Sequence, residues 1–160
     1  MSRRGSLKKH QLPKADPIYN NRFLSKLINK VMRSGKKTVA EREVYRTIKI
    51  IEEKTGSEPI KLFEQALLNV APRMEVRPRR VGGASYQVPI EVRGNRKAHL
   101  AMKWIIEAAR KRSNKEYHHF SEKLAAELID ASKGLGESIK KRDSTHKMAD
   151  ANRAFAHFRW

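Results

Sequence analysis

Residues 73–92, RMEVRPRRVGGASYQVPIEV, show the clearest structural pattern in the chain. Apolar and polar residues alternate on both sides of Gly82-Gly83, and this pattern predicts two β-strands joined by a tight turn. Pro78 and Pro89 indicate exposed edge strands, because proline cannot donate a hydrogen bond to a central sheet ladder. A two-stranded ribbon is only marginally stable alone, so we expect this hairpin to have a partner.

On both sides of the hairpin, apolar residues recur at helical spacing. The predicted domain organisation is a basic N-terminal tail over residues 1–16 and a single helical domain over residues 17–160, with the hairpin arm at about 73–92. Before the hairpin, the predicted helices are a first from Asn20 to Arg33, a second from Thr38 that Gly56 ends, and a third capped by Ser57 and stopped by Pro72. After the hairpin, they are a fourth after Gly94-Asn95, a fifth around Phe120 to Ile129, and a last from Glu137 to His157. The sequence thus predicts a helical bundle with one inserted basic hairpin.

The charge balance points to a polyanionic partner. Lys and Arg number 36 against 17 Asp and Glu, which gives a formal net charge of +19. A chain this basic repels itself unless a polyanion neutralises it, and nucleic acid is the commonest such partner. An anionic membrane is the rival, but no apolar run approaches the roughly 18 residues that a span needs. We therefore expect a nucleic-acid partner and no membrane.

Catalytic and metal-binding motifs are weak in this sequence. The chain has no cysteine, which excludes disulfides, thiolate metal sites and cysteine nucleophiles. Residues 34–38, SGKKT, resemble the end of a phosphate-binding loop, but the upstream glycine is missing and a helix precedes them, so a helix stop with a basic turn is favoured. The adjacent His118 and His119 would point about 100° apart on a helix. We expect no enzyme, no metal, no cofactor and no small-molecule substrate.

Basic residues form clusters along the chain. Packing could bring these clusters onto one phosphate-binding face; separate solvated faces are the alternative. Arginine dominates the hairpin, and its planar guanidinium binds phosphate through two N–H groups and stacks on bases. The clusters are the tail (Arg3, Arg4, Lys8, Lys9), the first helix and its exit (Lys26, Lys30, Arg33, Lys36, Lys37), the hairpin (Arg73, Arg77, Arg79, Arg80), the entry to the fourth helix (Arg93, Arg96, Lys97) and its exit (Arg110, Lys111, Arg112).

Composition does not distinguish RNA from DNA. A helical body with an Arg-rich β-arm also describes architectural DNA-binding proteins that insert ribbons into the minor groove. Such proteins usually dimerise, with one arm on each subunit. From the residues alone, this alternative stays open.

Residues 79–92, RRVGGASYQVPIEV, resemble the signature of the small-subunit ribosomal protein S-seven family, bacterial and organellar type. Further segments match in order along nearly the whole chain: 16–19 (DPIY), 35–37 (GKK), 101–104 (AMKW), 108–112 (AARKR), 127–128 (EL) and 148–157 (MADANRAFAH). The resemblance implies a mainly α fold, a six-helix bundle with a protruding two-stranded antiparallel β-hairpin.

The same resemblance implies a function. Family members are structural constituents of the small ribosomal subunit and primary rRNA-binding proteins that nucleate assembly of the 3′ major (head) domain. They lie at the subunit interface near the exit-site tRNA, beside small-subunit ribosomal proteins nine and eleven, and bacterial members can repress their own mRNA. The expected location is the cytoplasmic ribosome, with the plastid stroma or the mitochondrial matrix as the alternative.

Site residues follow from family position. The tail and the clusters around Lys26 to Lys37, Arg77 to Arg80 and Arg110 to Arg112 should face rRNA. The hairpin tip (Val81, Gly82, Gly83, Ala84) and the last helix, with Arg142, Lys147 and Arg153, should lie near the exit-site tRNA and the messenger. The stretch 113–123 departs from the family pattern because it is longer and more aromatic. There, Tyr117 or His119 either stacks on an rRNA base or packs locally.

Overall fold

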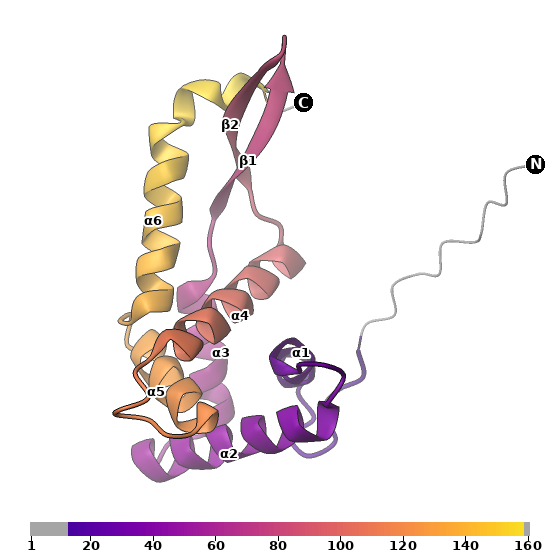
Figure 1. The fold of residues 1–160 in the computed structure, drawn as a ribbon, viewed down its shortest axis with the longest axis vertical. Helices are drawn as coiled ribbons and strands as arrows, with labels where there is room; N and C mark the ends of the chain where they lie inside the picture. Colours follow the sequence, from indigo (N-terminus) through magenta and orange to yellow (C-terminus); the bar gives the residue numbers. More distant parts are fainter. Residues whose placement is uncertain (1–12, 159–160) are drawn as a thin grey trace, which may run out of the picture.

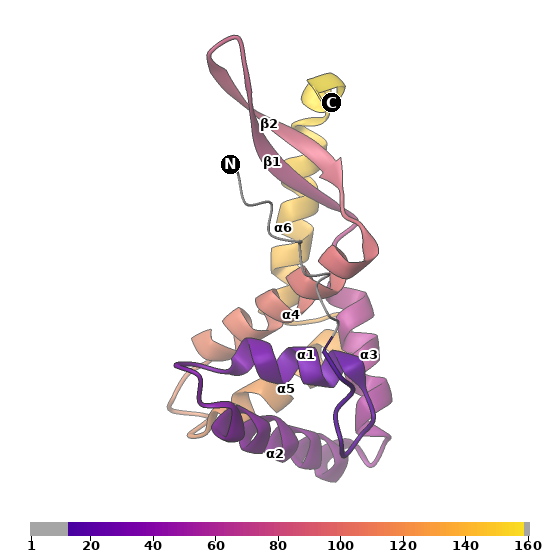
Figure 2. The same ribbon diagram turned by 90° about the vertical axis from the view of Figure 1, so that its right-hand side faces the viewer.

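The structure, a computed structural model, describes residues 13–158. It is mostly helical, and a β-hairpin rises from one end of the helical body with the last helix beside it (Figures 1 and 2). The elements are α1 (Arg22–Val31), α2 (Lys37–Thr55), α3 (Pro59–Val70), β1 (Met74–Val81), β2 (Ala84–Glu91), α4 (Gly94–Lys111), α5 (Phe120–Ser132), α6 (Glu137–Ala151) and the 3₁₀-helix η1 (Arg153–Phe158). The predicted mainly α fold with a two-stranded antiparallel hairpin is confirmed.

The hydrophobic core lies mainly among α1 to α5, where each helix buries one apolar stripe, and Ile139 of α6 and Val92 also join it. α1 buries Leu24, Leu27, Ile28 and Val31, which recur at helical spacing. Its start is fixed by Asn21, whose side chain accepts hydrogen bonds from the backbone N–H groups of the next turn. This packing fixes the direction of α1 and therefore the placement of its basic residues.

Several predicted helix boundaries differ from the structure: α1 spans Arg22–Val31 and not Asn20 to Arg33, and α2 begins at Lys37 and not at Thr38. Gly56 does end α2, in the left-handed conformation expected of a helix stop, with φ 59°. Ser57, however, does not cap α3: Glu58 is the N-cap residue, and the Ser57 hydroxyl donates instead to Oγ1 of Thr55 at 2.9 Å. The last helix does not run to His157, because the chain changes to the 3₁₀ form after α6.

The two predicted strands form, and they meet at the predicted Gly82-Gly83 turn. Val81 pairs with Ala84 and Met74 with Glu91, so the strands are fully matched around the turn. Gly82 and Gly83 both have positive φ, 56° and 89°, which is the geometry of a two-residue turn whose twist matches that of the strands.

The partner of the hairpin is the C-terminal part of the same chain. At the hairpin base, the backbone N–H of Arg73 donates to Nε2 of His146 on α6 at 3.0 Å. Further along the arm, the Tyr86 ring packs against Phe155 and Phe158 of η1, with ring centroids 5.3 Å and 5.1 Å apart. α6 and η1 therefore hold the arm along its length, and α6 is attached more firmly than its polar sequence suggests.

A buried carboxylate joins α4, α5 and α6. Glu127 of α5 is fully buried and accepts hydrogen bonds from Arg112 at 2.9 and 2.7 Å, and from the backbone N–H and hydroxyl of Ser138 at 3.1 and 2.7 Å. Gly136 lies against this carboxylate, and an added Cβ would come within 2.9 Å of Oε1 of Glu127. These contacts fix the start of α6 against α5 and the end of α4.

Candidate nucleic-acid interface

Helices α1 and α4 pack together and bring basic residues from two distant parts of the sequence into one surface. Nζ of Lys30 donates to the backbone carbonyl of His99 at 2.6 Å, and Nη2 of Arg110 donates to the carbonyl of Val31 at 3.3 Å. Both bonds join the C-terminal end of α1 to α4, at His99 and at Arg110. We call the basic residues around them, Lys30, Arg33, Arg96, Lys103 and Arg110, the α1–α4 surface.

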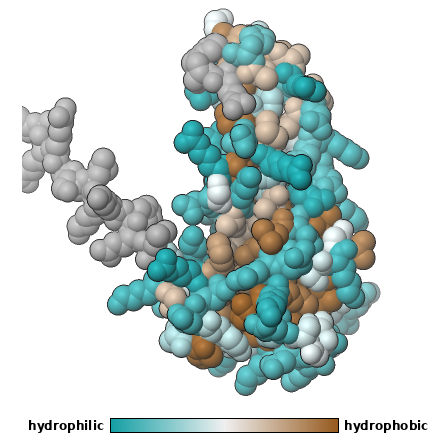
Figure 3. Space-filling model, turned by 180° about the vertical axis from the view of Figure 1, so that it is seen from behind, coloured by the Kyte–Doolittle hydropathy of each residue, from teal (hydrophilic) through white to brown (hydrophobic). Residues whose placement is uncertain are grey.

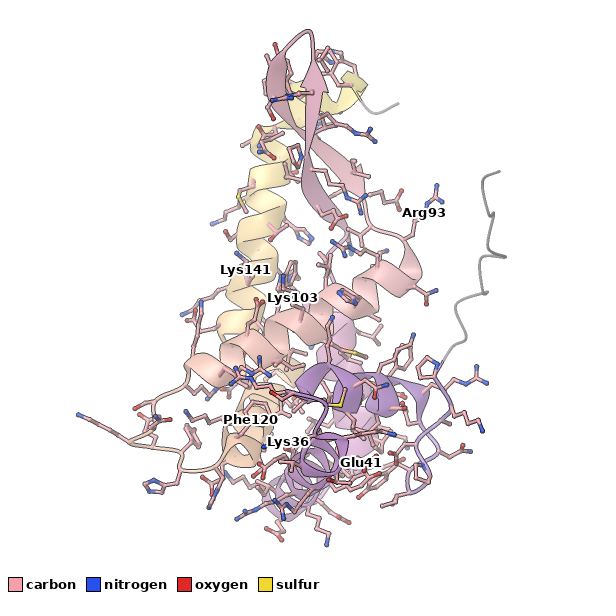
Figure 4. The ribbon with its side chains drawn as sticks, turned by 45° about the vertical axis from the view of Figure 1, so that its right-hand side comes forward. Lys36, Glu41, Arg93, Lys103, Phe120 and Lys141 are labelled. Atoms are coloured by element: carbon pink, nitrogen blue, oxygen red, sulfur yellow. The ribbon has the colours of Figure 1, made fainter. Side chains whose placement is uncertain are left out.

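On α4 the members of this surface form a row. Arg96, Lys103 and Arg110 are spaced seven residues apart, so each is rotated only about 20° from the last around the helix. All are exposed, and Lys103 lies midway along α4 (Figure 4). Lys103 was missed by the sequence prediction, although its seven-residue spacing from two predicted residues would have identified it.

Burial and neighbouring positive charges lower the pKa values of three groups in and beside this surface. Burial first, and then the nearby positive charges of Lys103 and Arg96, together lower the pKa of Lys30 to about 8. Burial and the same kind of repulsion also lower the pKa of His99, and the pKa of Arg110 falls through burial and the charge of Arg33. The surface therefore carries more positive charge than its own carboxylates offset, which is the condition for binding a polyanion.

Among the described residues, Glu107 is the only carboxylate that raises the pKa values of Lys30 and Arg110. It forms an ion pair with Lys103 at 3.7 Å, and both side chains are about half exposed. An exposed pair of this kind contributes little stability and is readily exchanged for a stronger phosphate contact. Glu107 thus leaves the surface open to an anion.

The hairpin joins the α1–α4 surface through one carboxylate. Oε1 of Glu75 on β1 accepts from Nε of Arg77 at 2.6 Å, and Oε2 accepts from Arg96 on α4. The Glu75 side chain is only 10% exposed, whereas those of Arg77 and Arg96 are 52% and 46% exposed. Both guanidinium groups are therefore fixed on the protein side and open toward solvent.

The two arginines nearest the hairpin tip point in opposite directions. Arg79 pairs with Tyr86 across the ribbon and Arg80 with Ser85, and consecutive residues of a strand face opposite sides of a sheet. Arg79 thus shares its face with the Tyr86 ring that packs on η1. The prediction grouped Arg79 and Arg80, but the structure places them on separate faces of one exposed arm.

The remaining predicted residues are spread around this surface. Lys36 lines a hollow of about 290 Å³ with Arg33 and Arg110, and Figure 4 shows it at the start of α2. Lys37 forms an ion pair with Glu41 at 3.4 Å. Lys26 lies over the Phe23 ring, 5.6 Å from its centroid. Arg73, Arg93 and Lys111 are exposed, Lys97 is half-buried, and Arg3, Arg4, Lys8 and Lys9 lie outside the described residues.

Arg112 differs from its neighbours at the end of α4. It binds Glu127 and Asp130 of α5, and it is more buried than Arg110 and Lys111. Burial opposes its charge, but hydrogen bonds with Asp130 and Glu127 outweigh this effect and raise the pKa of Arg112. Its guanidinium also lies 5.8 Å from the Tyr117 ring centroid. Arg112 holds the fold together, and its contact with RNA stays a prediction.

The predicted tRNA-proximal residues lie on the arm and on α6. Val81 to Ala84 form the end of the hairpin, far from the helical body (Figure 1). Lys147 and Arg153 are exposed. Arg142 is engaged internally: it donates to Oδ1 of Asp143 at 2.7 Å and to the carbonyl of Asn69.

The part of the chain that the structure describes lacks two other kinds of site. Residues 13–158 contain no cluster of His, Asp and Glu that could hold a metal ion. Among the same residues, no helix is long and apolar enough to cross a membrane. The space-filling view in Figure 3 shows brown residues gathered over the helical body, with teal side chains projecting among them and along the arm.

Known proteins resemble this chain over its whole length. The family model described as ribosomal protein S7p/S5e matches residues 2–153. Proteins named small ribosomal subunit protein uS7 are 54% identical in Carboxydothermus hydrogenoformans, 55% in Thermoanaerobacter sp. (strain X514) and 51% in Thermomicrobium roseum. Each alignment covers 100% of this chain and 100% of the relative.

Proposed function

The chain belongs to the ribosomal protein S7p/S5e family, and from that premise we propose that it binds rRNA of the small subunit through the α1–α4 surface and the hairpin base. Within the family its role is structural, in the ribosome. The observation that supports this interface is the position of Lys30 of α1, and of Arg33 just after that helix, near the basic row of α4. Phosphate contacts there would supply affinity, and the shape of a folded RNA junction would supply specificity.

We further propose that the protein nucleates assembly of the 3′ major domain. A protein that binds one conformation of an RNA junction more tightly than the others shifts the RNA toward it. Rigid placement of the bound groups favours this mechanism, and Glu75 provides it by holding Arg77 and Arg96 from two separate elements. Assembly would begin when this preset surface captures the junction.

The hairpin tip and the C-terminal helix are proposed to lie near the exit-site tRNA and the messenger. The tip Val81–Ala84 projects from the body, and η1 supports the arm behind it. Small-subunit ribosomal proteins nine and eleven are the proposed protein neighbours. If the protein binds its own mRNA, it would use the same basic surface. The bacterial relatives support a location in the cytoplasmic ribosome.

Binding measurements test the function directly. The complete chain should bind a transcript of the 3′ major domain more tightly than duplex DNA of equal length, by about a hundredfold or more in physiological salt. Equal affinity for random duplex DNA, together with dimer formation, would favour the architectural DNA-binding alternative.

Deletion of the tip tests the tRNA proposal separately. Small subunits should still incorporate a chain that lacks residues 81–84, because the α1–α4 surface is intact, but ribosomes carrying it should lose exit-site tRNA faster. Unchanged retention of that tRNA would show that the tip has another role.

A further inference from the structure

A second basic strip lies on α2, outside the interface described above. Arg42, Arg46 and Lys49 are exposed and follow one another at helical spacing. At about 100° per residue they lie opposite the buried stripe that contains Val44 and Ile48. Within residues 13–158, none of the three has a carboxylate within the 4.0 Å of an ion pair, whereas the neighbouring Lys37 does.

The strip faces away from the rest of the molecule. The inner side of α2 packs against α1, α3 and α5, so its outer side points away from the body. Figures 1 and 2 both show α2 at the end of the molecule opposite the hairpin tip. RNA bound along the arm and RNA bound on this strip would therefore be separate segments.

The dimensions of the strip suit a short stretch of backbone. With a rise of about 1.5 Å per residue, the span from Arg42 to Lys49 is about 10 Å. Glu53 follows on the same face and ends the run of positive charge. The three cations themselves line a shallow hollow of about 490 Å³, together with Thr38, Glu41 and Tyr45. Glu41 forms its ion pair with Lys37, at 3.4 Å. The hydroxyl of Tyr45 donates to Oδ1 of Asp16 at 2.7 Å, so the binding groups are the three cations.

The chemistry of the strip favours RNA over an acidic protein. A protein interface normally has an apolar centre from which charged residues are depleted. None of the exposed large apolar residues in the described chain lies between Arg42 and Lys49. Val39, one turn before Arg42, is the only exposed large apolar residue of α2, and it lies at the edge of the strip. Three cations without an ion pair among the described residues, on a chain of net charge +19, match a phosphate backbone instead.

We propose that Arg42, Arg46 and Lys49 bind the backbone of a second RNA segment, so that the protein bridges two parts of the rRNA. The inference rests on the proposed rRNA-binding function and extends it. A protein that holds two segments fixes their relative position, which a single interface cannot do.

Charge removal tests the strip. The variant Arg42→Gln/Arg46→Gln/Lys49→Gln keeps good helix formers at exposed positions. The variant Lys54→Gln/Lys61→Gln/Lys133→Gln is a control with equal charge loss at exposed sites outside the strip, of which Lys54 is in the last turn of α2. For the 3′ major domain transcript, the strip variant should flatten the dependence of log affinity on log salt by about 2 to 3. Its affinity should fall about tenfold or more in physiological salt. A slope equal to that of the control would overturn the proposal.

Tethered cleavage identifies the RNA segments. Because the chain has no native cysteine, Glu53→Cys and Ser85→Cys each create a unique attachment point for an iron chelate that cleaves nearby RNA. Cleavage from position 53 should map to a different segment from cleavage at position 85. No cuts from position 53, or cuts at the same segment only, would contradict bridging. Failure of the wild-type chain to prefer this transcript would instead refute the proposed function itself.

Discussion

Arg96 of α4 donates from Nε and Nη2 to the same carboxylate oxygen of Glu75 on β1, at 3.3 Å each. The other oxygen of Glu75 accepts from Arg77 on the same strand as Glu75. One nearly buried carboxylate thereby fixes the arm relative to the helix that carries the basic row. This relationship makes the hairpin and the α1–α4 surface one interface.

Replacing Glu75 by Gln should reduce the preference for the correct RNA. The two arginines would remain charged, but the amide of Gln has one acceptor oxygen in place of two and presents N–H donors to the other arginine. Binding to any RNA therefore persists, while the orientation of the guanidinium groups is lost. We expect the ratio of affinities for the 3′ major domain and for a scrambled transcript to fall severalfold in anisotropy titrations. Glu91→Gln, at an exposed position of β2, is the control and should keep the ratio. An unchanged ratio in Glu75→Gln would argue against a positioning role.

Arg110 and Arg112 should separate binding from stability. Arg112→Ala leaves Glu127, whose side chain is 1% exposed, without its cationic partner. Loss of one partner of a buried pair costs about 3 kcal/mol or more, so the thermal midpoint should drop by several degrees. Arg110→Ala should leave the midpoint near wild type and weaken RNA binding. Circular dichroism and RNA titration measure the two effects, and the reverse pattern would contradict these assignments.

Gly136 should tolerate alanine less well than Gly134 does. Both have positive φ, 97° and 76°, so either substitution introduces backbone strain of about 1 kcal/mol or more. Only at Gly136 would the new Cβ also come within 2.9 Å of the Glu127 carboxylate. Urea unfolding should therefore show a larger loss of stability for Gly136→Ala. Equal losses of stability for the two variants would mean that the Glu127 side chain can move away from the new Cβ with little loss of free energy.

RNA binding should weaken above about pH 8 because of Lys30. Its pKa lies at about 8 in the folded protein against 10.5 ordinarily, owing first to burial and then to Lys103 and Arg96. The folded chain therefore binds fewer protons than the unfolded chain between these pH values, and this group makes the fold more stable as pH rises through them. The free protein meanwhile loses a phosphate-binding charge.

The pH dependence can be isolated with Lys30→Arg, whose guanidinium stays charged throughout. Between pH 7 and 9, wild-type affinity for the 3′ major domain should decline severalfold, while that of the variant should stay nearly constant. Parallel pH profiles would show that Lys30 does not contact the RNA.

The sequence predicted the hairpin and the buried faces of the helices well, because both depend on the spacing of apolar residues over a few neighbouring positions. Alternation around Gly82-Gly83 and the apolar stripe of α1 are readable without tertiary information. The N-cap of α3 was misplaced because Ser57 found a different hydrogen-bond partner, Thr55. Such competition between short polar side chains is invisible in the sequence.

The candidate site was only partly predictable. Charge clusters indicated the surface, but the sequence could not separate Arg110 from Arg112, since only tertiary packing places Glu127 and Asp130 beside the latter. It also missed Lys103 and the carboxylate of Glu75, whose partners lie on another element. Long-range pairing decides which cations are open to RNA, and that information appears only in the fold.

The salt dependence of RNA binding tests the α1–α4 surface most directly. The variant Lys30→Gln/Arg33→Gln/Lys103→Gln removes positive charge from both helices, and the Lys54/Lys61/Lys133 variant again serves as the control. For the 3′ major domain transcript, we predict that the plot of log affinity against log salt becomes shallower by about 2 to 3. A slope identical to that of the control would show that the converging cations of α1 and α4 do not bind the RNA.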